Sequence, residues 1–186
     1  MRRAILAFTG SLFLLSSPLL HHPIEQAKLR AVWIETEIGI GSGVAIRSGL
    51  VLTNRHVVEG SKNIRVDGKI ARVLRRSDRA DLALLAVPTR ALPPVRIQTR
   101  TAVGDKVFYV GNPGGNRDYV GQGRILDYPE GRIHSSAFAW GGFSGSGLYN
   151  DSGDLVGIQT EWTAFLGSSP DGLAIPASAV IEFLKR

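Results

Sequence analysis

The sequence contains no cysteine among its 186 residues. This absence excludes disulfides, thiolate metal sites and a cysteine nucleophile. Stability must therefore come from the packing of side chains. Histidine is also scarce, with four in the chain, so few residues could act as a general base near neutral pH.

The charge balance is only modestly basic, with a formal net charge of +6. Six basic residues fall within one stretch: Arg65, Lys69, Arg72, Arg75, Arg76 and Arg79. Two interpretations stay open, a solvated strand face with its loop, or a surface for an anionic partner such as a membrane or an acidic polymer. No aromatic residues alternate with these cations and no nucleic-acid-binding motif is present, so we expect no nucleic-acid partner.

Residues 1–27 differ in character from the rest of the chain. Arg2 and Arg3 form a basic start, and the segment from Ala4 to Leu20 is almost uncharged and largely apolar. This pattern predicts an export signal, and hence a periplasmic or secreted protein. No clear Ala-x-Ala cleavage motif follows, so two outcomes stay open: removal of the signal, or its retention as a membrane anchor, although it is short for a full span.

Residues 28–186 have the length of one ordinary domain. Short β-branched runs alternate there with Gly, Asn, Asp and Pro, which predicts an all-β sandwich or barrels. The expected strands are Ala31–Glu37, Gly43–Ile46, Leu50–Thr53, Asn63–Val66, Ile70–Leu74, Leu82–Val87, Lys106–Val110, Tyr119–Leu126, Arg132–Ser135, Gly147–Tyr149, Leu155–Glu161 and Leu173–Ile175. Pro93 and Pro94 split them into two halves, about 30–90 and 100–186, and residues 177–186 have helical periodicity.

Three segments carry a possible catalytic group. His56 follows the apolar run Val51–Thr53, Asp81 opens the run Leu82–Val87, and Ser144 lies within Gly141–Gly147. The chain order His, Asp, Ser is that of the chymotrypsin-type triad and differs from the orders in subtilisin and in α/β-hydrolases.

These residue types fit acyl transfer. Ser144 needs a base to become a nucleophile, and His56 could remove its proton and return it to the leaving amine. Asp81 could bind the other ring nitrogen and fix the tautomer. The N–H groups of Gly142 and Ser144 could form an oxyanion hole, because glycine adopts the required dihedrals. The competing candidates are His21, His22 and His134 for the base, Asp78 for the carboxylate and Ser146 for the nucleophile.

The chain resembles the bacterial trypsin-like serine peptidases. The segment Leu52–Val58 is similar to the histidine segment of both the HtrA/Deg proteases and the V8-like glutamyl endopeptidases. Asp81–Leu85 and Val110–Gly115 look like HtrA, whereas Gly141–Ser146 and the segments Leu148–Asn150 and Val156–Ile158 look closer to V8. The resemblance covers about residues 35–180. It implies two six-stranded antiparallel β-barrels with a short C-terminal helix and the triad in the cleft between them.

The sequence also departs from these families. Phe143 stands where members usually have Asn or Asp, which argues against activation by a freed N-terminus, and Gly147 replaces a common proline. Gln159 stands where V8-like enzymes carry a substrate-reading histidine, which argues against a preference for glutamate. We find no PDZ domain, so HtrA-style cage assembly is not expected.

By the same resemblance, Phe138 and Thr160-Glu161-Trp162 should line the primary substrate pocket. Phe138 falls where enzymes that cut after Lys or Arg keep a buried aspartate, so small or medium apolar residues should be preferred before the cut. The expected activity is that of a serine endopeptidase acting on polypeptides without a metal or organic cofactor. Two alternatives stay open, a catalytically silent peptidase-fold binding module and an esterase.

Overall fold

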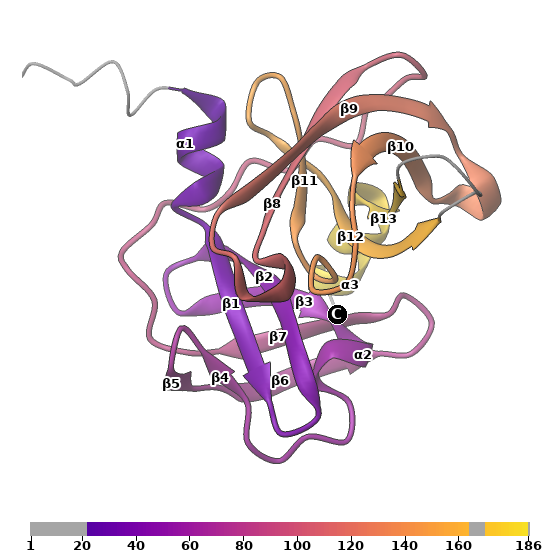
Figure 1. The fold of residues 1–186 in the computed structure, drawn as a ribbon. Coiled ribbons are helices and arrows are strands. Elements are labelled where there is room, and N and C mark those ends of the chain that lie inside the picture. The colour runs from indigo at the N-terminus through magenta and orange to yellow at the C-terminus, as the bar shows by residue number, and fades with distance from the viewer. Residues whose placement is uncertain (1–21, 164–169, 186) are drawn as a thin grey trace, which may run out of the picture.

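The structure is a computed structural model that describes residues 22–163 and 170–185. The chain forms two β-units, one above the other, with the N-terminal unit in indigo to magenta and the C-terminal unit in salmon to yellow (Figure 1). The all-β prediction with a short C-terminal helix is confirmed. The uncharged stretch of the expected export signal, Ala4–Leu20, lies outside the described residues.

The first unit is one curled antiparallel sheet of seven strands. Its order is β5-β4-β1-β2-β3-β7-β6, so β5 and β6 are the edges. The strands are β1 (Ala31–Thr36), β2 (Gly39–Arg47), β3 (Leu50–Asn54), β4 (Arg65–Val66), β5 (Lys69–Ile70), β6 (Arg72–Ser77) and β7 (Leu82–Ala86), with the one-turn helix α2 (Arg55–Val58) after β3. Alternate apolar side chains fill its concave face, among them Ile34, Val51 and Leu85.

One expected strand of this unit, Ile70–Leu74, is divided in two. Ile70 ends β5 with 75% of its surface exposed, whereas Ala71 is buried and donates a backbone hydrogen bond of 2.9 Å to Ile64 O. The chain therefore turns inward at Ala71 before Arg72 begins β6. The result is a seven-stranded sheet where the resemblance implied six strands.

The second unit is a closed six-stranded barrel, as expected, with the order β10-β13-β12-β11-β8-β9. Its elements are β8 (Lys106–Gly111), η2 (Pro113–Gly115), β9 (Tyr119–Asp127), η3 (Pro129–Gly131), β10 (Ile133–Phe138), β11 (Gly147–Asn150), β12 (Leu155–Thr163) and β13 (Asp171–Pro176). Buried aromatic and aliphatic residues occupy its interior, including Tyr109, Phe143 and Leu148. Burial raises the pKa of Tyr109 above its ordinary value, so its hydroxyl stays neutral.

Two helices pack against the core that the two units share. The predicted C-terminal helix is α3 (Ala177–Lys185), which buries Val180 and Phe183. A further helix, α1 (Pro23–Lys28), begins inside the expected leader 1–27 and ends one residue beyond it, and its Ala27 is only 2% exposed. The folded part therefore begins several residues before the expected boundary, because Ile24 and Ala27 pack against the body of the protein. None of the helices in the described ranges is long and apolar enough to cross a membrane.

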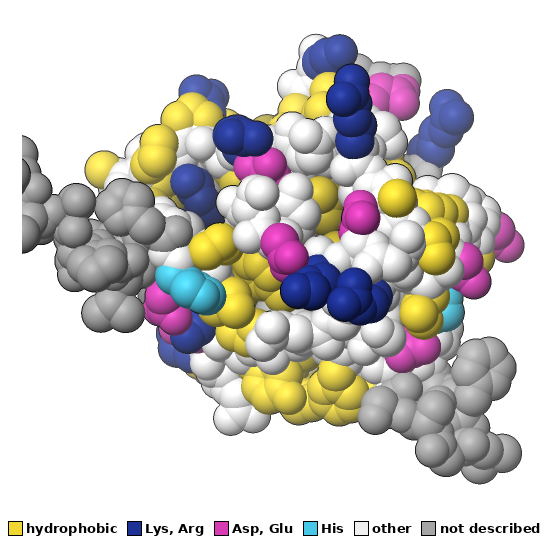
Figure 2. Space-filling view, turned by 90° about the horizontal axis from the view of Figure 1, so that it is seen from above, with side chains coloured by type: hydrophobic (Ala, Val, Ile, Leu, Met, Phe, Trp, Pro, Cys, Tyr) yellow, Lys and Arg dark blue, Asp and Glu magenta, His cyan; other side chains and the backbone are white. Residues whose placement is uncertain are grey.

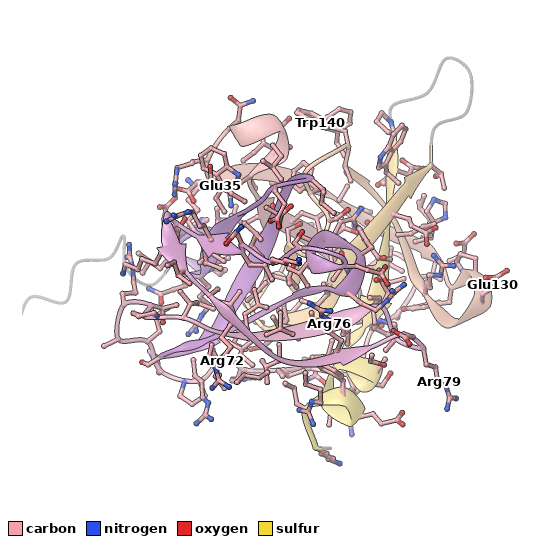
Figure 3. The ribbon with its side chains drawn as sticks, turned by 90° about the horizontal axis from the view of Figure 1, so that it is seen from below. Glu35, Arg72, Arg76, Arg79, Glu130 and Trp140 are labelled. Carbon is pink, nitrogen blue, oxygen red and sulfur yellow. The ribbon has the colours of Figure 1, made fainter. Side chains whose placement is uncertain are left out.

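Of the six residues of the basic stretch, Arg65 lies on β4 and Lys69 on β5, whereas the other four lie on the edge strand β6 and in the turn after it. Arg72, Arg76 and Arg79 are visible there from below (Figure 3). Arg75 points the other way, and its guanidinium lies 4.8 Å from the centre of the Phe183 ring. The view from above shows charges of both signs scattered among apolar side chains (Figure 2).

Candidate active site

His56 is held at the end of a buried strand. β3 stops at Asn54, and α2 begins one residue before His56. Two groups at this junction bind the same acceptor, since Asn54 Nδ2 and Arg55 N each donate to Asp81 O at 3.1 Å. The chain around His56 is thus fixed to the start of β7, while the imidazole itself remains exposed.

Asp81 is the carboxylate that faces His56. Its Oδ2 lies 2.8 Å from His56 Nδ1, and its Oδ1 accepts a bond of 3.0 Å from His56 N. The residue has a φ of +49°, a left-handed conformation that aspartate tolerates better than most residues. The competing Asp78 is instead exposed and lies 3.4 Å from Arg55 Nε. The geometry therefore pairs His56 with Asp81.

The electrostatics keep this carboxylate charged. Burial raises the pKa of Asp81, but the hydrogen bonds from the His56 ring and the His56 backbone, assisted by one from Thr160, outweigh burial. The net effect is a pKa below its ordinary value of 3.8. Asp81 is therefore ionised at neutral pH, as a partner that stabilises an imidazolium must be.

Ser144 lies in the loop between β10 and β11. Its carbonyl accepts a bond of 2.8 Å from Ser42 N, and its hydroxyl donates to Thr160 O at 3.2 Å. A Cβ added at Gly41 would lie 2.7 Å from Val57 Cγ1 and 3.4 Å from Ser144 O, so this loop packs close to α2. The competing Ser146 is fully buried, and its hydroxyl donates to Phe143 O at 2.6 Å.

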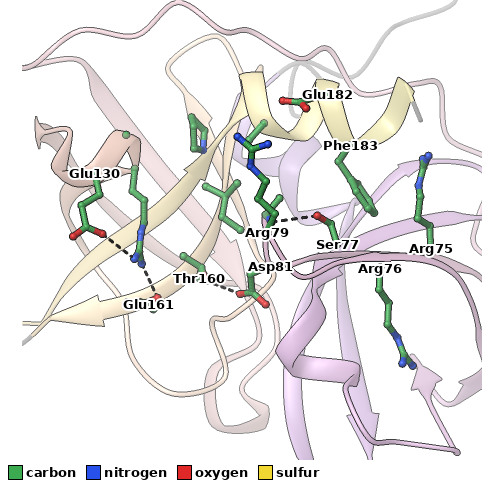
Figure 4. Close-up of a pocket in the computed structure, with 16 residues that line it drawn as sticks. Arg75, Arg76, Ser77, Arg79, Asp81, Glu130, Thr160, Glu161, Glu182 and Phe183 are labelled. Atoms are coloured by element: carbon green, nitrogen blue, oxygen red, sulfur yellow. Dashed lines mark hydrogen bonds and ion pairs between the residues drawn. The ribbon is translucent and has the colours of Figure 1, made fainter.

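Thr160 joins the expected catalytic residues. Its carbonyl accepts from Ser144, and its hydroxyl donates to Asp81 Oδ2 at 2.9 Å (Figure 4). The sequence indicated Thr160 only as a wall of the substrate pocket. Its side chain instead contacts Asp81, a role that no sequence pattern signals because the two residues are 79 positions apart.

The loop before Ser144 leaves two backbone donors free. Gly142 has a φ of +95°, in the region that favours glycine. Within the described part of the chain, the N–H groups of Gly142 and Ser144 have no acceptor, whereas the intervening Phe143 N donates to Trp140 O at 3.1 Å. This pattern suits an oxyanion hole formed by the residues that the sequence predicted.

The other expected pocket residues are spread over two strands. Phe138 ends β10, and its ring lies edge-on to Trp140 with 4.6 Å between the ring centres. On β12, Trp162 is 50% exposed, and Glu161 forms an ion pair of 2.6 Å with Arg132. Residues 164–169, between β12 and β13, lie outside the described part of the chain.

A cavity of about 490 Å³ opens beside these residues, between the β6–β7 turn, η3 and α3 (Figure 4). Its lining includes Asp81, Thr160 and Glu161 but neither His56 nor Ser144. It therefore lies behind the Asp81–Thr160 pair and away from the expected reacting atoms. The described residues contain no cluster of three or more His, Asp or Glu side chains that could hold a metal ion.

The chain is similar in sequence to known peptidases. Residues 41–158 match the trypsin-like peptidase domain family. Periplasmic serine endoprotease DegP of Salmonella typhimurium is 32% identical over 163 residues, which cover 77% of this chain and 34% of the relative. Serine endoprotease DegS of the same species is 34% identical over 171 residues, covering 79% and 48%. The chain thus spans between a third and a half of the length of these relatives.

Solved structures show the same likeness. A serine endoprotease from Yersinia pestis aligns with a TM-score of 0.78 and 28% identity, covering 88% of this chain and 64% of that one. An inactive serine-to-alanine mutant of Rv3671c from M. tuberculosis aligns with a TM-score of 0.77 and 25% identity, covering 91% and 92%. On its sequence and its double β-unit fold, this chain belongs to the trypsin-like peptidase domain family.

Proposed function

We propose that this protein is a serine endopeptidase that cleaves polypeptides through an acyl-enzyme on Ser144. The observation that carries the proposal is one hydrogen-bonded chain, in which Asp81 binds His56 and Thr160, and Thr160 binds Ser144. These residues come from both β-units, so the fold brings together groups that are distant in sequence. A binding module would have no need of this hydrogen-bonded chain.

In the proposed reaction, His56 takes the proton of the Ser144 hydroxyl as the oxygen attacks the scissile carbonyl. The hydroxyl donates to Thr160 O in this structure, so this hydrogen bond has to be exchanged for one to His56 before the proton is transferred. The tetrahedral intermediate then places its oxyanion against the N–H groups of Gly142 and Ser144. His56 protonates the leaving amine as the C–N bond breaks. Water then attacks the acyl-enzyme and gives a proton to His56, and His56 returns this proton to Ser144 Oγ as the ester bond breaks.

We propose a preference for small or medium apolar residues before the cut. Phe138 stands at the end of β10 where a basic-specific enzyme would need a carboxylate, and an ammonium without a partner is costly to bury. Asp171 pairs with Phe138 in strand register, but its carboxylate lies 3.3 Å from His134 Nε2. Glu161 is likewise occupied by Arg132. These contacts disfavour Lys or Arg in the pocket.

We also propose that the protein is exported and works in the periplasm or outside the cell. The basic start and apolar stretch within residues 2–20 support export, and the relative DegP is named as a periplasmic protease. Deletion of residues 2–20 should leave the protein in the cytoplasm with its fold intact. Recovery of the full-length protein from the soluble cytoplasm would contradict this assignment.

The activity is tested by incubating the protein with an unfolded polypeptide library and reading the products by mass spectrometry. We expect internal cuts after Ala, Val or Leu, and no cuts with the Ser144→Ala variant. Equal cleavage by both proteins would refute the proposed nucleophile. Cuts that depend on Ser144 but follow Lys, Arg or Glu would refute only the proposed pocket.

A further inference from the structure

Ser42 on β2 is completely buried, and all of its polar atoms are used. Its N–H donates to Ser144 O at 2.8 Å, and its carbonyl accepts from Thr53 Oγ1 at 2.7 Å. Its hydroxyl donates to Gly142 O at 2.7 Å and accepts from Asn112 N at 2.8 Å. One small side chain of the first β-unit is therefore bonded to two separate segments of the second.

The hydroxyl acts on the peptide unit that joins Gly142 to Phe143. The carbonyl of this unit accepts from Ser42 Oγ, and its N–H donates to Trp140 O at 3.1 Å. The unit is thus held at both ends. With its plane fixed, the N–H groups on either side, those of Gly142 and Ser144, remain without an acceptor in the described part of the chain.

Gly142 needs such an external restraint. Its φ of +95° is one of several conformations open to glycine at similar energy, and no side chain limits the choice. The peptide unit could therefore rotate if only the loop itself held it. The backbone N–H of Asn112 keeps the Ser42 hydroxyl oriented, because it occupies an acceptor position of Oγ and leaves the proton directed at Gly142 O.

We infer that Ser42 is a positioning residue for the oxyanion hole. Its side-chain hydroxyl holds the loop in the conformation in which the N–H groups of Gly142 and Ser144 are free to bind an oxyanion. The inference rests on the proposed peptidase function and assigns to Ser42 a role in the rate of acylation. Ser42 does not touch the substrate. Loss of its hydroxyl leaves the half-buried Gly142 O and the buried Asn112 N without these partners, and the loop gains freedom to turn a free N–H away from the oxyanion.

We expect the loss of the Ser42 hydroxyl to weaken stabilisation of the transition state and not binding of the substrate. Removal of a whole oxyanion donor costs roughly 100- to 1,000-fold in kcat. Because the donors remain in Ser42→Ala and only their orientation is loosened, we expect kcat to fall about 10- to 100-fold with KM nearly unchanged. The His56–Asp81 pair is untouched, so the acidic limb of the kcat/KM pH profile should keep its midpoint.

The matched control is Ser135→Ala. Ser135 lies on β10 and is also completely buried, and its hydroxyl lies 3.3 Å from Tyr109 Oη in the interior of the second barrel. Both variants lose one buried serine hydroxyl, so a general loss of stability affects both. Only Ser42→Ala should lose kcat when rates are expressed per folded molecule.

The decisive probe is a peptide boronic acid built on the best-cleaved sequence, because its adduct with Ser144 places an oxygen in the oxyanion hole. Its inhibition constant should rise in Ser42→Ala by the factor by which kcat/KM falls, and should stay constant in Ser135→Ala. Ser42→Cys, with a thiol that donates weakly, should fall between native and Ser42→Ala. It also decides the matter if the alanine variant does not fold.

Two results would overturn the inference. One is a native kcat in folded Ser42→Ala or, if that variant is unfolded, in Ser42→Cys. The other is a loss confined to KM with unchanged boronate binding. Failure of the proposed function would look different, since the native protein itself would then neither cleave polypeptides nor bind the boronate.

Discussion

The hydroxyl of Thr160 in the second barrel donates a hydrogen bond of 2.9 Å to Asp81 in the first β-unit. Thr160 is buried, and its backbone carbonyl accepts from the Ser144 hydroxyl. The hydrogen bonds of Asp81 and Ser144 to Thr160 therefore depend on how the two β-units are placed relative to each other. A shift between the units would alter the environment of Asp81 and of Ser144 together.

Thr160→Val should impair the enzyme without unfolding it. Valine keeps the shape of threonine but removes the donor, and a hydrogen bond to a charged group is worth about 1.5–3 kcal/mol. We expect kcat/KM to fall about tenfold or more, while Thr160→Ser retains most of the activity because its hydroxyl can still reach Asp81. Steady-state kinetics on a peptide substrate measure both. Equal activities of the valine and serine variants would show that the bond to Asp81 is irrelevant.

The charge of Asp81 makes stability depend on pH in a defined direction. Its folded pKa lies below its ordinary value of 3.8, so the stabilisation is complete above that value and is lost as pH falls through the folded pKa. The destabilisation caused by Asp81→Asn should thus be largest above about pH 5 and should shrink below about pH 4.

Urea unfolding of the native and Asp81→Asn proteins at several pH values measures this difference. Asp78→Asn is the control, because its exposed ion pair with Arg55 should be worth no more than about 1 kcal/mol. A difference between native and Asp81→Asn that grew on acidification would mean that the folded pKa is raised, contrary to the geometry.

Gly145→Ala should be far more disruptive than Gly39→Ala. Gly145 has a φ of +89°, and a Cβ there would lie 2.1 Å from Ser42 O. Gly39, by contrast, has a φ outside the left-handed region and no atom within 4 Å of a new Cβ. We expect Gly145→Ala to lose about 3 kcal/mol or more of unfolding free energy, and Gly39→Ala to change it by less than about 1 kcal/mol. Similar melting temperatures for the two variants would contradict this packing.

Helix α1 should contribute to the stability of the folded domain although it begins inside the expected leader. Ala27 is 2% exposed, so Ala27→Asp would bury an unpaired carboxylate and lower the unfolding free energy by several kcal/mol. Lys28→Ala, which removes only a partly exposed ion pair with Glu25, is the control. Thermal denaturation of both variants tests this. An unchanged melting temperature in Ala27→Asp would show that α1 is detached in solution.

Much of the fold could be predicted from local pattern. Apolar β-branched runs marked nearly every strand, and helical spacing marked α3, because burial on one face fixes the period of the sequence. Two features could not be predicted in this way. The first is the turn of the chain into the core at Ala71, which divides one expected strand in two. The second is α1, whose sequence could not be told apart from the apolar leader that precedes it. Both depend on contacts with distant segments.

In the candidate site, too, some residues could be predicted from local sequence and others depend on contacts between distant segments. The motifs around His56, Asp81 and Ser144 could be found because each has a distinctive local sequence. Ser42 and Thr160 could not be assigned their contacts in advance, since a buried serine or threonine on a strand resembles any other. Ser42 and Gly142 are 100 positions apart in the sequence, and only the folded chain brings them into hydrogen-bonding distance.

The most direct measurement is covalent labelling with a fluorophosphonate, which forms a phosphonyl ester on an activated serine with loss of fluoride. Peptide mapping of the native protein should place one adduct on Ser144. Ser146→Ala should still label, whereas Ser144→Ala should not and His56→Ala should label at least about 100-fold more slowly, since the base activates the nucleophile. An adduct on Ser146, or a folded native protein that does not label at all, would contradict the proposed nucleophile and its activation by His56.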